Sequence, residues 1–264
     1  MNQTKRHHNR KILIRKKKAI THLLWIFLDF KHINFKIEIL LFLIFQLKMK
    51  IAVFDVETTD LIKNSPSFHD TEKWPYIVQI SLILYNDENN SIEKINHIIK
   101  IPNHVEISKK SQELHGCSKD ICNKDGVLLS EVLPAINERF KQADIIVCHN
   151  VSFDKRMYIV ECLRNNIESC FTKKEYCTMK NTINLCAIKT PCKNNPNNYY
   201  NKYPKLIELY KHLFHEDAIN LHNSLTDVII CLRCYYMITH NKDLYERCNE
   251  YKELFNINQL RTTH

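Results

Sequence analysis

Residues 51–57 read IAVFDVE, an apolar run that ends in two acids. A short apolar run rich in β-branched and aromatic residues is typical of a buried strand. Strand side chains alternate between faces, so Asp55 and Glu57 point the same way, about 7 Å apart. Neighbouring buried carboxylates are costly unless cations offset their charge, and Mg²⁺ prefers carboxylate oxygens. The run therefore predicts a strand that ends in a metal site, although solvated loop acids often show the same pattern.

The residues beyond this strand predict one α/β domain with a mixed sheet. Residues 77–85 and 91–101 read as strands joined by the turn-forming residues 86–90, which predicts an antiparallel meander. An apolar strand is expected at 145–148, and a Pro- and Asn-rich loop at 188–204. Helical patterns fall at 108–115, 127–141, 153–164, 204–214 and 223–239. The polar residues 241–264 are expected to form a C-terminal tail that consists of a short helix with a frayed end.

Two further segments place acids at the starts of helices. Residues 148–154 (CHNVSFD) run from a strand end into a helix, with Asp154 near its first turn. In residues 221–227 (LHNSLTD), we expect His222 just ahead of a helix that Asn223 or Ser224 caps, with Asp227 in an early turn. Taken alone, each segment is explained by an ordinary helix start, where an acid is favoured by the helix dipole.

Taken together, four acids and one histidine in this order resemble the DEDDh family of 3′–5′ exonucleases. The likeness is strongest to the DnaQ-like branch, which includes the epsilon proofreading subunit of bacterial DNA polymerase III. The matching stretches are VFDVETT at 53–59, His149-Asn150, Phe153-Asp154, His222 and Asp227, with LHGCSK at 114–119 similar to a further family segment. The resemblance extends over residues 50–240. Asp60 stands where relatives usually have Gly, which we attribute to a composition with only two glycines.

The resemblance implies a ribonuclease H-like fold, a five-stranded mixed sheet flanked by helices, in an exonuclease domain at 49–240. It implies a two-metal mechanism, with His222 as the general base and nucleoside 5′-monophosphates as products. Thr58 and Asn150 are the residues expected to contact the terminal nucleotide. The implied ligands of the two divalent ions, Mg²⁺ or Mn²⁺, are Asp55, Glu57, Asp154 and Asp227.

The implied partner is a nucleic acid with a free 3′ end. The Val-Glu-Thr-Thr sequence at 56–59 favours DNA as the substrate. It therefore favours a role in replication or repair, with any DNA polymerase acting in trans. Two alternatives stay open: an RNA-trimming exoribonuclease of the same family, and a catalytically inactive nucleic-acid-binding module. An inactive relative is expected to lose at least one functional residue, whereas all five are present here.

The segment 188–205 offers a second nucleic-acid signal. Lysines near aromatic rings can follow a phosphate backbone and stack on bases, although an ordinary solvated loop has the same composition. The residues concerned are Lys189, Lys193, Lys202, Lys205, Tyr199, Tyr200 and Tyr203.

The net charge of +9 resides in an N-terminal extension. Residues 1–48 carry 11 of the 38 Lys and Arg and two of the 29 acids, which leaves 27 charges of each sign in the remainder. Neither apolar run of this extension reaches the length of about 20 residues that spans a bilayer. One interpretation is that Met49 is the start of the protein. The others are that residues 1–48 form a basic extension, an interfacial membrane helix or a targeting segment, and membrane association is not favoured.

Composition and cysteine usage limit the class of protein. With 44% hydrophobic and 25% charged residues among 264, the chain is globular and not disordered or collagenous. Eleven cysteines without regular spacing indicate a reducing compartment, the cytoplasm or the nucleus. Cys231 and Cys234 lack partners at zinc spacing, so a zinc site is not expected there.

Overall fold

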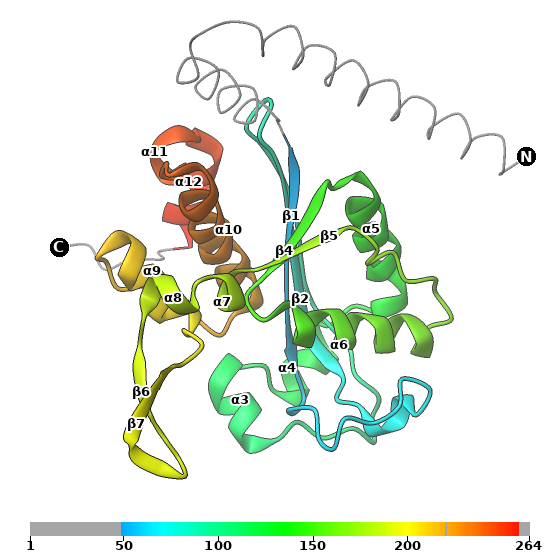
Figure 1. Ribbon diagram of the computed structural model, residues 1–264. Helices are drawn as coiled ribbons and strands as arrows, with labels where there is room; N and C mark the ends of the chain where they lie inside the picture. The colour runs from blue at the N-terminus through cyan, green and yellow to red at the C-terminus, as the bar shows by residue number, and fades with distance from the viewer. Residues whose placement is uncertain (1–48, 220, 259–264) are drawn as a thin grey trace, which may run out of the picture. The chain divides into compact units, whose positions relative to one another are not determined.

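The computed structural model describes residues 49–219 and 221–258, which are built around one five-stranded sheet (Figure 1). The strands lie in the order β3-β2-β1-β4-β5. β1 pairs antiparallel with β2 and parallel with β4, β2 pairs antiparallel with β3, and β4 pairs parallel with β5. The strands are β1 (Lys50–Thr58), β2 (Ile77–Asn86), β3 (Ser91–Ile98), β4 (Ile145–Cys148) and β5 (Lys174–Cys177). The mixed sheet that the resemblance implies, a meander continued by parallel strands, is confirmed.

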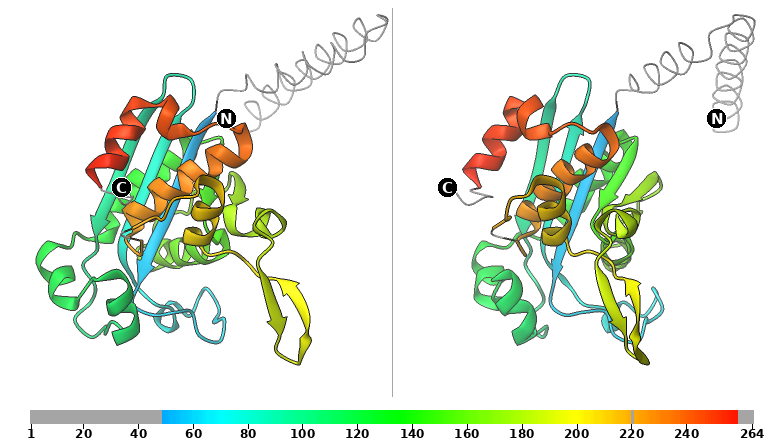
Figure 2. Two further views of the ribbon diagram at one scale, coloured as in Figure 1. Left: turned by 90° about the vertical axis from the view of Figure 1, so that its left-hand side faces the viewer. Right: turned by 60° about the vertical axis from the view of Figure 1, so that its left-hand side comes forward.

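Helices cover both faces of this sheet (Figures 1 and 2). Helices α5 and α6 pack on one face, and α9, α10 and α12 pack on the other. The longer helices are α5 (Leu129–Gln142), α6 (Val151–Arg164), α9 (Leu206–Phe214), α10 (Ser224–His240) and α12 (Asn249–Ile257). The shorter ones are the 3-10 turn η1 (Thr71–Lys73), α3 (Lys109–His115), α4 (Lys119–Asp125), α7 (Thr178–Asn181), α8 (Ile183–Cys186) and α11 (Leu244–Arg247).

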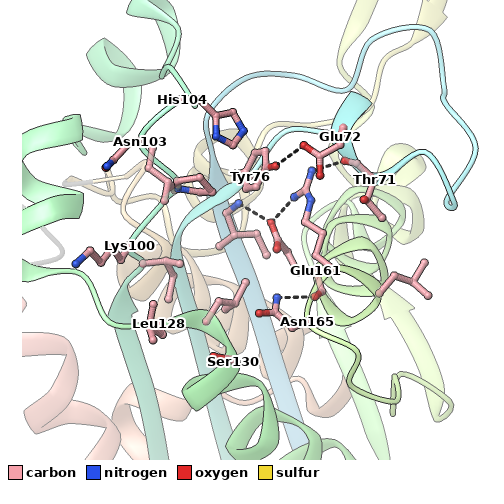
Figure 3. A pocket seen from close by; sticks show the side chains of 17 residues that line it. Thr71, Glu72, Tyr76, Lys100, Asn103, His104, Leu128, Ser130, Glu161 and Asn165 are labelled. Atoms are coloured by element: carbon pink, nitrogen blue, oxygen red, sulfur yellow. Dashed lines mark hydrogen bonds and ion pairs between the residues drawn. The ribbon is translucent and has the colours of Figure 1, made fainter.

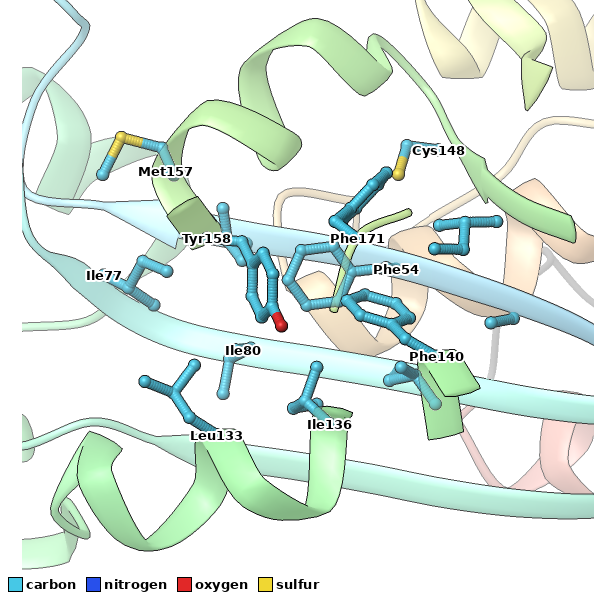
Figure 4. Close-up of a cluster of buried hydrophobic side chains, with 14 of the residues drawn as sticks. Phe54, Ile77, Ile80, Leu133, Ile136, Phe140, Cys148, Met157, Tyr158 and Phe171 are labelled. Atoms are coloured by element: carbon cyan, nitrogen blue, oxygen red, sulfur yellow. The ribbon is translucent and has the colours of Figure 1, made fainter. Parts of the chain in front are cut away.

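The first core lies between the sheet and α5 and α6 (Figure 4). Phe54 of β1 meets Phe140 of α5 with ring centroids 5.3 Å apart and Tyr158 of α6 at 6.0 Å, both edge to face. Phe171, in the segment that leads to β5, completes the group at 6.4 Å from Phe54. Edge-to-face aromatic pairs contribute about 0.5–1.5 kcal/mol beyond their buried area. This cluster fixes the position of α6, which carries Asp154, against β1.

The second core lies on the opposite face, where α10 crosses β1 and β2. Ile51 and Val53 of β1 are buried there, whereas Phe54 and Val56 belong to the first core. Because strand side chains alternate, Asp55 and Glu57 continue the face of Ile51 and Val53. The period of two residues thus directs both acids to the side of the sheet on which α10 begins.

Several elements differ from the sequence-based predictions. The segment 188–204, predicted as a loop, forms a hairpin of β6 (Lys189–Cys192) and β7 (Asn195–Asn201). Its Pro- and Asn-rich composition is untypical of strands, so the pairing of the two segments could not be predicted from the sequence. Helices α4, α7 and α8 and strand β5 were also not predicted. In the predicted C-terminal tail, α11 and α12 bury Tyr245 and Phe255 in the second core.

The predicted N-terminal extension, residues 1–48, lies outside the described residues, as do the interpretations of it as a membrane or targeting segment. Among residues 49–219 and 221–258, no helix has the length and hydropathy of a membrane span. All eleven cysteines fall within these ranges and are free thiols.

A pocket of about 700 Å³ opens between η1, the start of α5 and the end of α6 (Figure 3). None of the predicted site residues lines it. Its buried wall contains the ion pair of Arg164 and Glu161, 2.6 Å apart, with side chains only 8% and 4% exposed. Arg164 also donates to the carbonyls of Pro75 and Trp74 and lies 3.6 Å over the Tyr76 ring. The pair therefore ties α6 to the loop that follows β1.

We expect Arg164→Ala to lower the free energy of unfolding by about 3–5 kcal/mol, because it leaves the Glu161 carboxylate buried without its cation. Glu161→Gln is the matched change, and it should cost less because Arg164 keeps its carbonyl acceptors. Urea denaturation followed by circular dichroism measures both. A loss below about 1 kcal/mol for Arg164→Ala would show that this ion pair does not hold the loop.

Candidate active site

Three carboxylates converge where β1 ends and α10 begins. Oxygen atoms of Asp55, Glu57 and Asp227 all lie within 4.8 Å of one another. Asp55 and Glu57 come from alternate positions of β1, and Asp227 comes from the first turn of α10. Three of the four predicted metal ligands, separated by up to 172 positions in sequence, are thus brought together.

The fourth predicted ligand, Asp154, lies beside this cluster but outside the group of three. It is in the first turn of α6 and only 2% exposed. Its Oδ1 accepts a hydrogen bond of 3.3 Å from the backbone amide of Val56, the residue between the two acids of β1. Its charge is close enough to raise the pKa of Asp55.

The start of α10 is held against β2 by a polar clamp. Asn223 is the N-cap, and its Oδ1 accepts the amide of Leu225 at 3.1 Å, so the predicted capping is confirmed. Gln79 of β2 donates from Nε2 to that same Oδ1, and its Oε1 accepts the amide of Ser224 at 3.2 Å. The hydroxyls of Ser81 and Ser224 are 2.7 Å apart. These contacts set the position from which Asp227 reaches the cluster.

Sequence reasoning did not identify this clamp, although a signal was present. Gln79 and Ser81 interrupt an otherwise apolar strand, and both are fully buried. Buried polar side chains are nearly always hydrogen-bonded, so two of them in a central strand predict a polar partner across the core. The partner itself, the start of α10, lies 143 or more residues away and could not be predicted from the sequence.

His222 lies just ahead of the cap, as predicted. It is exposed and adopts a left-handed backbone conformation with φ of 68°. Its backbone amide hydrogen-bonds the Asp227 carboxylate, which lowers the pKa of that acid. Partial burial and the nearby Lys205 ammonium lower the pKa of the His222 imidazole. His222 is therefore neutral at pH 7, the state that a general base requires.

The two predicted substrate contacts lie on the elements that carry the acids, Thr58 at the end of β1 and Asn150 just ahead of α6. Thr58 is buried, and its hydroxyl donates to the Asp60 carbonyl at 2.8 Å. Its own carbonyl accepts Nε2–H of His115, whose Nδ1 accepts the amide of Cys117. This gives the segment around His115 a role in holding the strand end. Asn150 precedes α6 with φ of 82° and makes no side-chain cap bond.

Asp60 stands where relatives of the predicted family usually have Gly, and the local geometry accepts it. Its φ is not in the left-handed region, so glycine is not required there. Its carboxylate accepts the amide of Leu61 and pairs with Lys63, which lowers its pKa.

The cluster carries unfavourable charge in its ionised form. Burial, together with the charges of Asp154, Asp227 and Glu57, raises the pKa of Asp55 well above its ordinary value. Burial and the Asp227 charge raise the pKa of Glu57 to about 8. Burial also raises the pKa of Asp227 to about 7. Adjacent carboxylates that resist ionisation are stabilised by a cation between them.

The residues present fit a divalent metal ion. Oδ1 of Asp227 is buried and has no hydrogen-bond partner among the described residues, an arrangement that a bound cation would satisfy. All donors of the cluster are carboxylate oxygens, the ligands that hard ions such as Mg²⁺ and Mn²⁺ prefer.

A family comparison agrees with this geometry. The RNase_T family model, described as exonuclease, matches residues 52–235. The chain belongs to this exonuclease family. The match contains all of the predicted site residues, and the predicted resemblance to DEDDh exonucleases is confirmed. No curated protein sequence shows a significant match.

Solved exonuclease structures share the fold of this exonuclease. The nuclease domain of 3′hExo, a DEDDh family member bound to rAMP, is 13% identical with a TM-score of 0.54, covering 75% of this chain and 95% of that one. E. coli Exonuclease I in complex with a dT13 oligonucleotide is 13% identical with a TM-score of 0.55, covering 77% and 43%. A full-length 3′-exonuclease is 17% identical with a TM-score of 0.54, covering 75% and 62%. The predicted ribonuclease H-like fold is therefore confirmed.

The pKa shifts of the exonuclease predict how its stability depends on pH. In the unfolded chain the carboxyl groups of Glu57 and Asp227 titrate near pH 4. Between about pH 6.5 and 8 these two groups therefore bind protons in the folded state but not in the unfolded state. Stability must then fall as pH rises through this window. We expect the melting temperature in EDTA to drop by about 5 °C, and millimolar Mg²⁺ or Mn²⁺ to reverse the drop.

Asp227→Asn is the control for this measurement, because it removes one carboxylate and keeps the side-chain shape. Its melting temperature should depend less on both pH and metal. The partly buried His149, whose pKa burial lowers to about 4, is neutral in the folded state, and its titration near pH 6.5 in the unfolded chain adds little to the slope above pH 7. Equal stabilisation of the parent and the variant by metal would contradict a metal site at this cluster.

Proposed function

We propose that this exonuclease is metal-dependent and removes nucleoside 5′-monophosphates from the 3′ end of nucleic acid, with DNA preferred over RNA. The observation that carries the proposal is the convergence of Asp55, Glu57 and Asp227, with a buried carboxylate oxygen unpaired, beside the exposed His222. Carboxylate clusters of this kind are suited to phosphodiester hydrolysis with divalent ions.

In this proposal each residue of the cluster has one task. Two ions, Mg²⁺ or Mn²⁺, would supply charge stabilisation at phosphorus and a more acidic water. Neutral His222 accepts the proton of the attacking water at its imidazole. Thr58 and Asn150 position the terminal nucleotide. The residues that would hold the ions are Asp55, Glu57, Asp154 and Asp227.

The preference for DNA rests on the Val-Glu-Thr-Thr sequence at 56–59, and it favours a role in replication or repair with any polymerase acting in trans. Solved neighbours were crystallised with both kinds of ligand, rAMP for 3′hExo and a dT13 oligonucleotide for Exonuclease I. Eleven free thiols support a reducing compartment, cytoplasmic or nuclear.

The test is a nuclease assay of the full chain on 5′-labelled single-stranded DNA and RNA of the same sequence, with Mg²⁺, Mn²⁺ or EDTA. We expect a metal-dependent ladder that shortens from the 3′ end, with faster cleavage of DNA. Faster cleavage of RNA would replace the DNA preference with the exoribonuclease alternative. Binding without cleavage in either metal would overturn the enzyme and leave a nucleic-acid-binding module.

A further inference from the structure

The β6–β7 hairpin projects from the domain at the end where β1 terminates (Figures 1 and 2). It is a separate two-stranded sheet that does not join the five-stranded one. An isolated two-stranded hairpin is only marginally stable in water. A contribution to the stability of the fold therefore does not by itself explain why the domain has this arm. Pro191 in β6 also limits pairing of the exposed edge with another chain.

The composition of this arm differs from that of the rest of the domain. Residues 188–205 contain four lysines and no acid, whereas residues 49–264 as a whole carry 27 charges of each sign. Lys189 and Lys193 are exposed and form no ion pair with any described residue, whereas Lys202 pairs with Glu208. Three exposed rings accompany these lysines: Tyr199 (62% exposed), Tyr200 (49%) and Tyr203 (53%).

The register of the hairpin places a cation and a ring on one face. Lys189 is paired with Asn201, and Pro191 with Tyr199. Side chains of directly opposed residues share a face, and residues two apart in a strand do so as well. Lys189 and Tyr199 are therefore diagonal neighbours on one face, and Tyr200, paired with Thr190, lies on the other. Lys193 sits in the two-residue turn at the tip.

The base of the hairpin is tied to the acidic site. Nε2–H of His149 donates to the carbonyl of Pro204 at 3.1 Å, and the next residue, Asn150, begins the turn into α6. The amide of Lys202 donates to the carbonyl of Ile188, which closes the hairpin. Lys205, one residue beyond Pro204, is close enough to His222 for its charge to act on the imidazole. The base of the hairpin therefore lies beside His222 and the turn into α6.

We propose that the β6–β7 hairpin is a binding arm for single-stranded nucleic acid upstream of the 3′ end, with Lys189 and Tyr199 on its contact face. The inference rests on the proposed function. Unpaired lysines suit phosphates, and an exposed ring suits stacking on any base, a combination typical of sequence-tolerant single-strand binding. A protein partner is not favoured, because the exposed large apolar side chains of the arm, among the residues whose burial is described, are its three tyrosines.

The length of the arm sets which substrates reach it. β7 has seven residues and extends about 20 Å. Stacked nucleic acid advances about 3.4 Å per nucleotide along one strand, so the arm spans about six nucleotides. A dinucleotide held at the acidic site does not reach the tip, whereas an oligonucleotide of about 20 residues extends along its whole length.

The test compares Tyr199→Ala and Lys189→Ala with the control Tyr200→Ala, which removes the ring on the opposite face. KM and kcat of the full chain are measured on an oligothymidylate of about 20 nucleotides and on a thymidine dinucleotide. We expect the contact-face variants to raise KM for the long substrate about tenfold, with kcat and all dinucleotide constants unchanged. Tyr200→Ala should match the parent on both substrates. Because the basic residues 1–48 are the same in all variants, any contribution they make to substrate binding cancels when the variants are compared.

Anisotropy of the labelled oligothymidylate in EDTA separates this inference from the proposed function. Tighter binding by the parent and Tyr200→Ala than by Tyr199→Ala would support the arm. It would do so even if no protein cleaves with Mg²⁺ or Mn²⁺, the outcome that rejects the enzyme. Equal losses on long and short substrates would indicate a structural role for Tyr199 and overturn the proposal. Unchanged binding by both contact-face variants, or a loss confined to Tyr200→Ala, would overturn it as well.

Discussion

Asp55→Asn should lower kcat for removal of the 3′-terminal nucleotide by at least about 10³-fold, the largest effect that we expect from one substitution. Metal-assisted charge stabilisation at phosphorus contributes several kcal/mol, and about 4 kcal/mol corresponds to a factor of 10³. Asp55 is the acid on which the charges of Asp154, Asp227 and Glu57 all act. Its substitution therefore removes the one carboxylate whose pKa all three of the other acids raise.

The same substitution should stabilise the metal-free protein. It removes a carboxylate whose ionisation is opposed by burial and by three acids, while the side-chain shape is kept. We expect a higher melting temperature than the parent in EDTA at pH 8, and a smaller rise on addition of Mn²⁺. A general loss of folding would lower both activity and melting temperature, so the opposite signs distinguish a site residue from a structural one.

Asp60→Asn is the matched control. Asp60 lies five residues along the same segment and pairs with Lys63 at the surface, where an ion pair contributes less than about 1 kcal/mol. Its kcat and metal response should stay close to those of the parent. If Asp55→Asn kept more than a tenth of the parental kcat, the proposed ligand set would be wrong.

The alternation of side chains along β1 made the placement of the first two acids predictable from sequence. Val53 and Phe54 pack on opposite faces, and Asp55 continues the face of Val53. The capped start of α10 was equally predictable from the sequence, because Asn223 stands directly before an apolar helical run. These features depend only on neighbouring residues.

The distances within the site were not predictable in the same way. Asp227 reaches Asp55 because Gln79 and Ser81 hold the start of α10 against β2, a contact that spans more than 140 positions. Asp154 lies beside the group of three because its Oδ1 is bound by the Val56 amide. Both arrangements depend on tertiary hydrogen bonds that no local pattern encodes.

Low glycine content removed another signal. Asn takes the left-handed conformation at five of the nine non-glycine positions with positive φ among the described residues, Asn150 at the site included. Asn tolerates this region better than other residues with a Cβ, so turns persist without their usual marker. Gly126 is kept where a Cβ would lie 2.1 Å from the Cys122 carbonyl oxygen. A search for glycine turns therefore misses most of the turns in this protein.

His222→Ala should lower kcat by about 10²–10⁴-fold, the range expected for loss of a general base. His222 is exposed ahead of α10, and its backbone amide hydrogen-bonds Asp227, a bond that alanine retains. The carboxylate cluster is therefore unchanged, and Mn²⁺ should raise the melting temperature of the variant as much as that of the parent. Loss of rate with retained metal response separates His222 from Asp55.

The pH profile gives the decisive measurement for His222. A general base acts when neutral, so kcat at saturating metal falls as pH drops through the imidazole pKa, which partial burial and Lys205 place below 6.5. This acidic limb should vanish in His222→Ala and shift to higher pH in Lys205→Ala, because removal of the ammonium raises the imidazole pKa. His212→Ala, an exposed histidine of α9, should leave the limb in place. If the limb persists in His222→Ala, the proton is accepted elsewhere, and His222 is not the base.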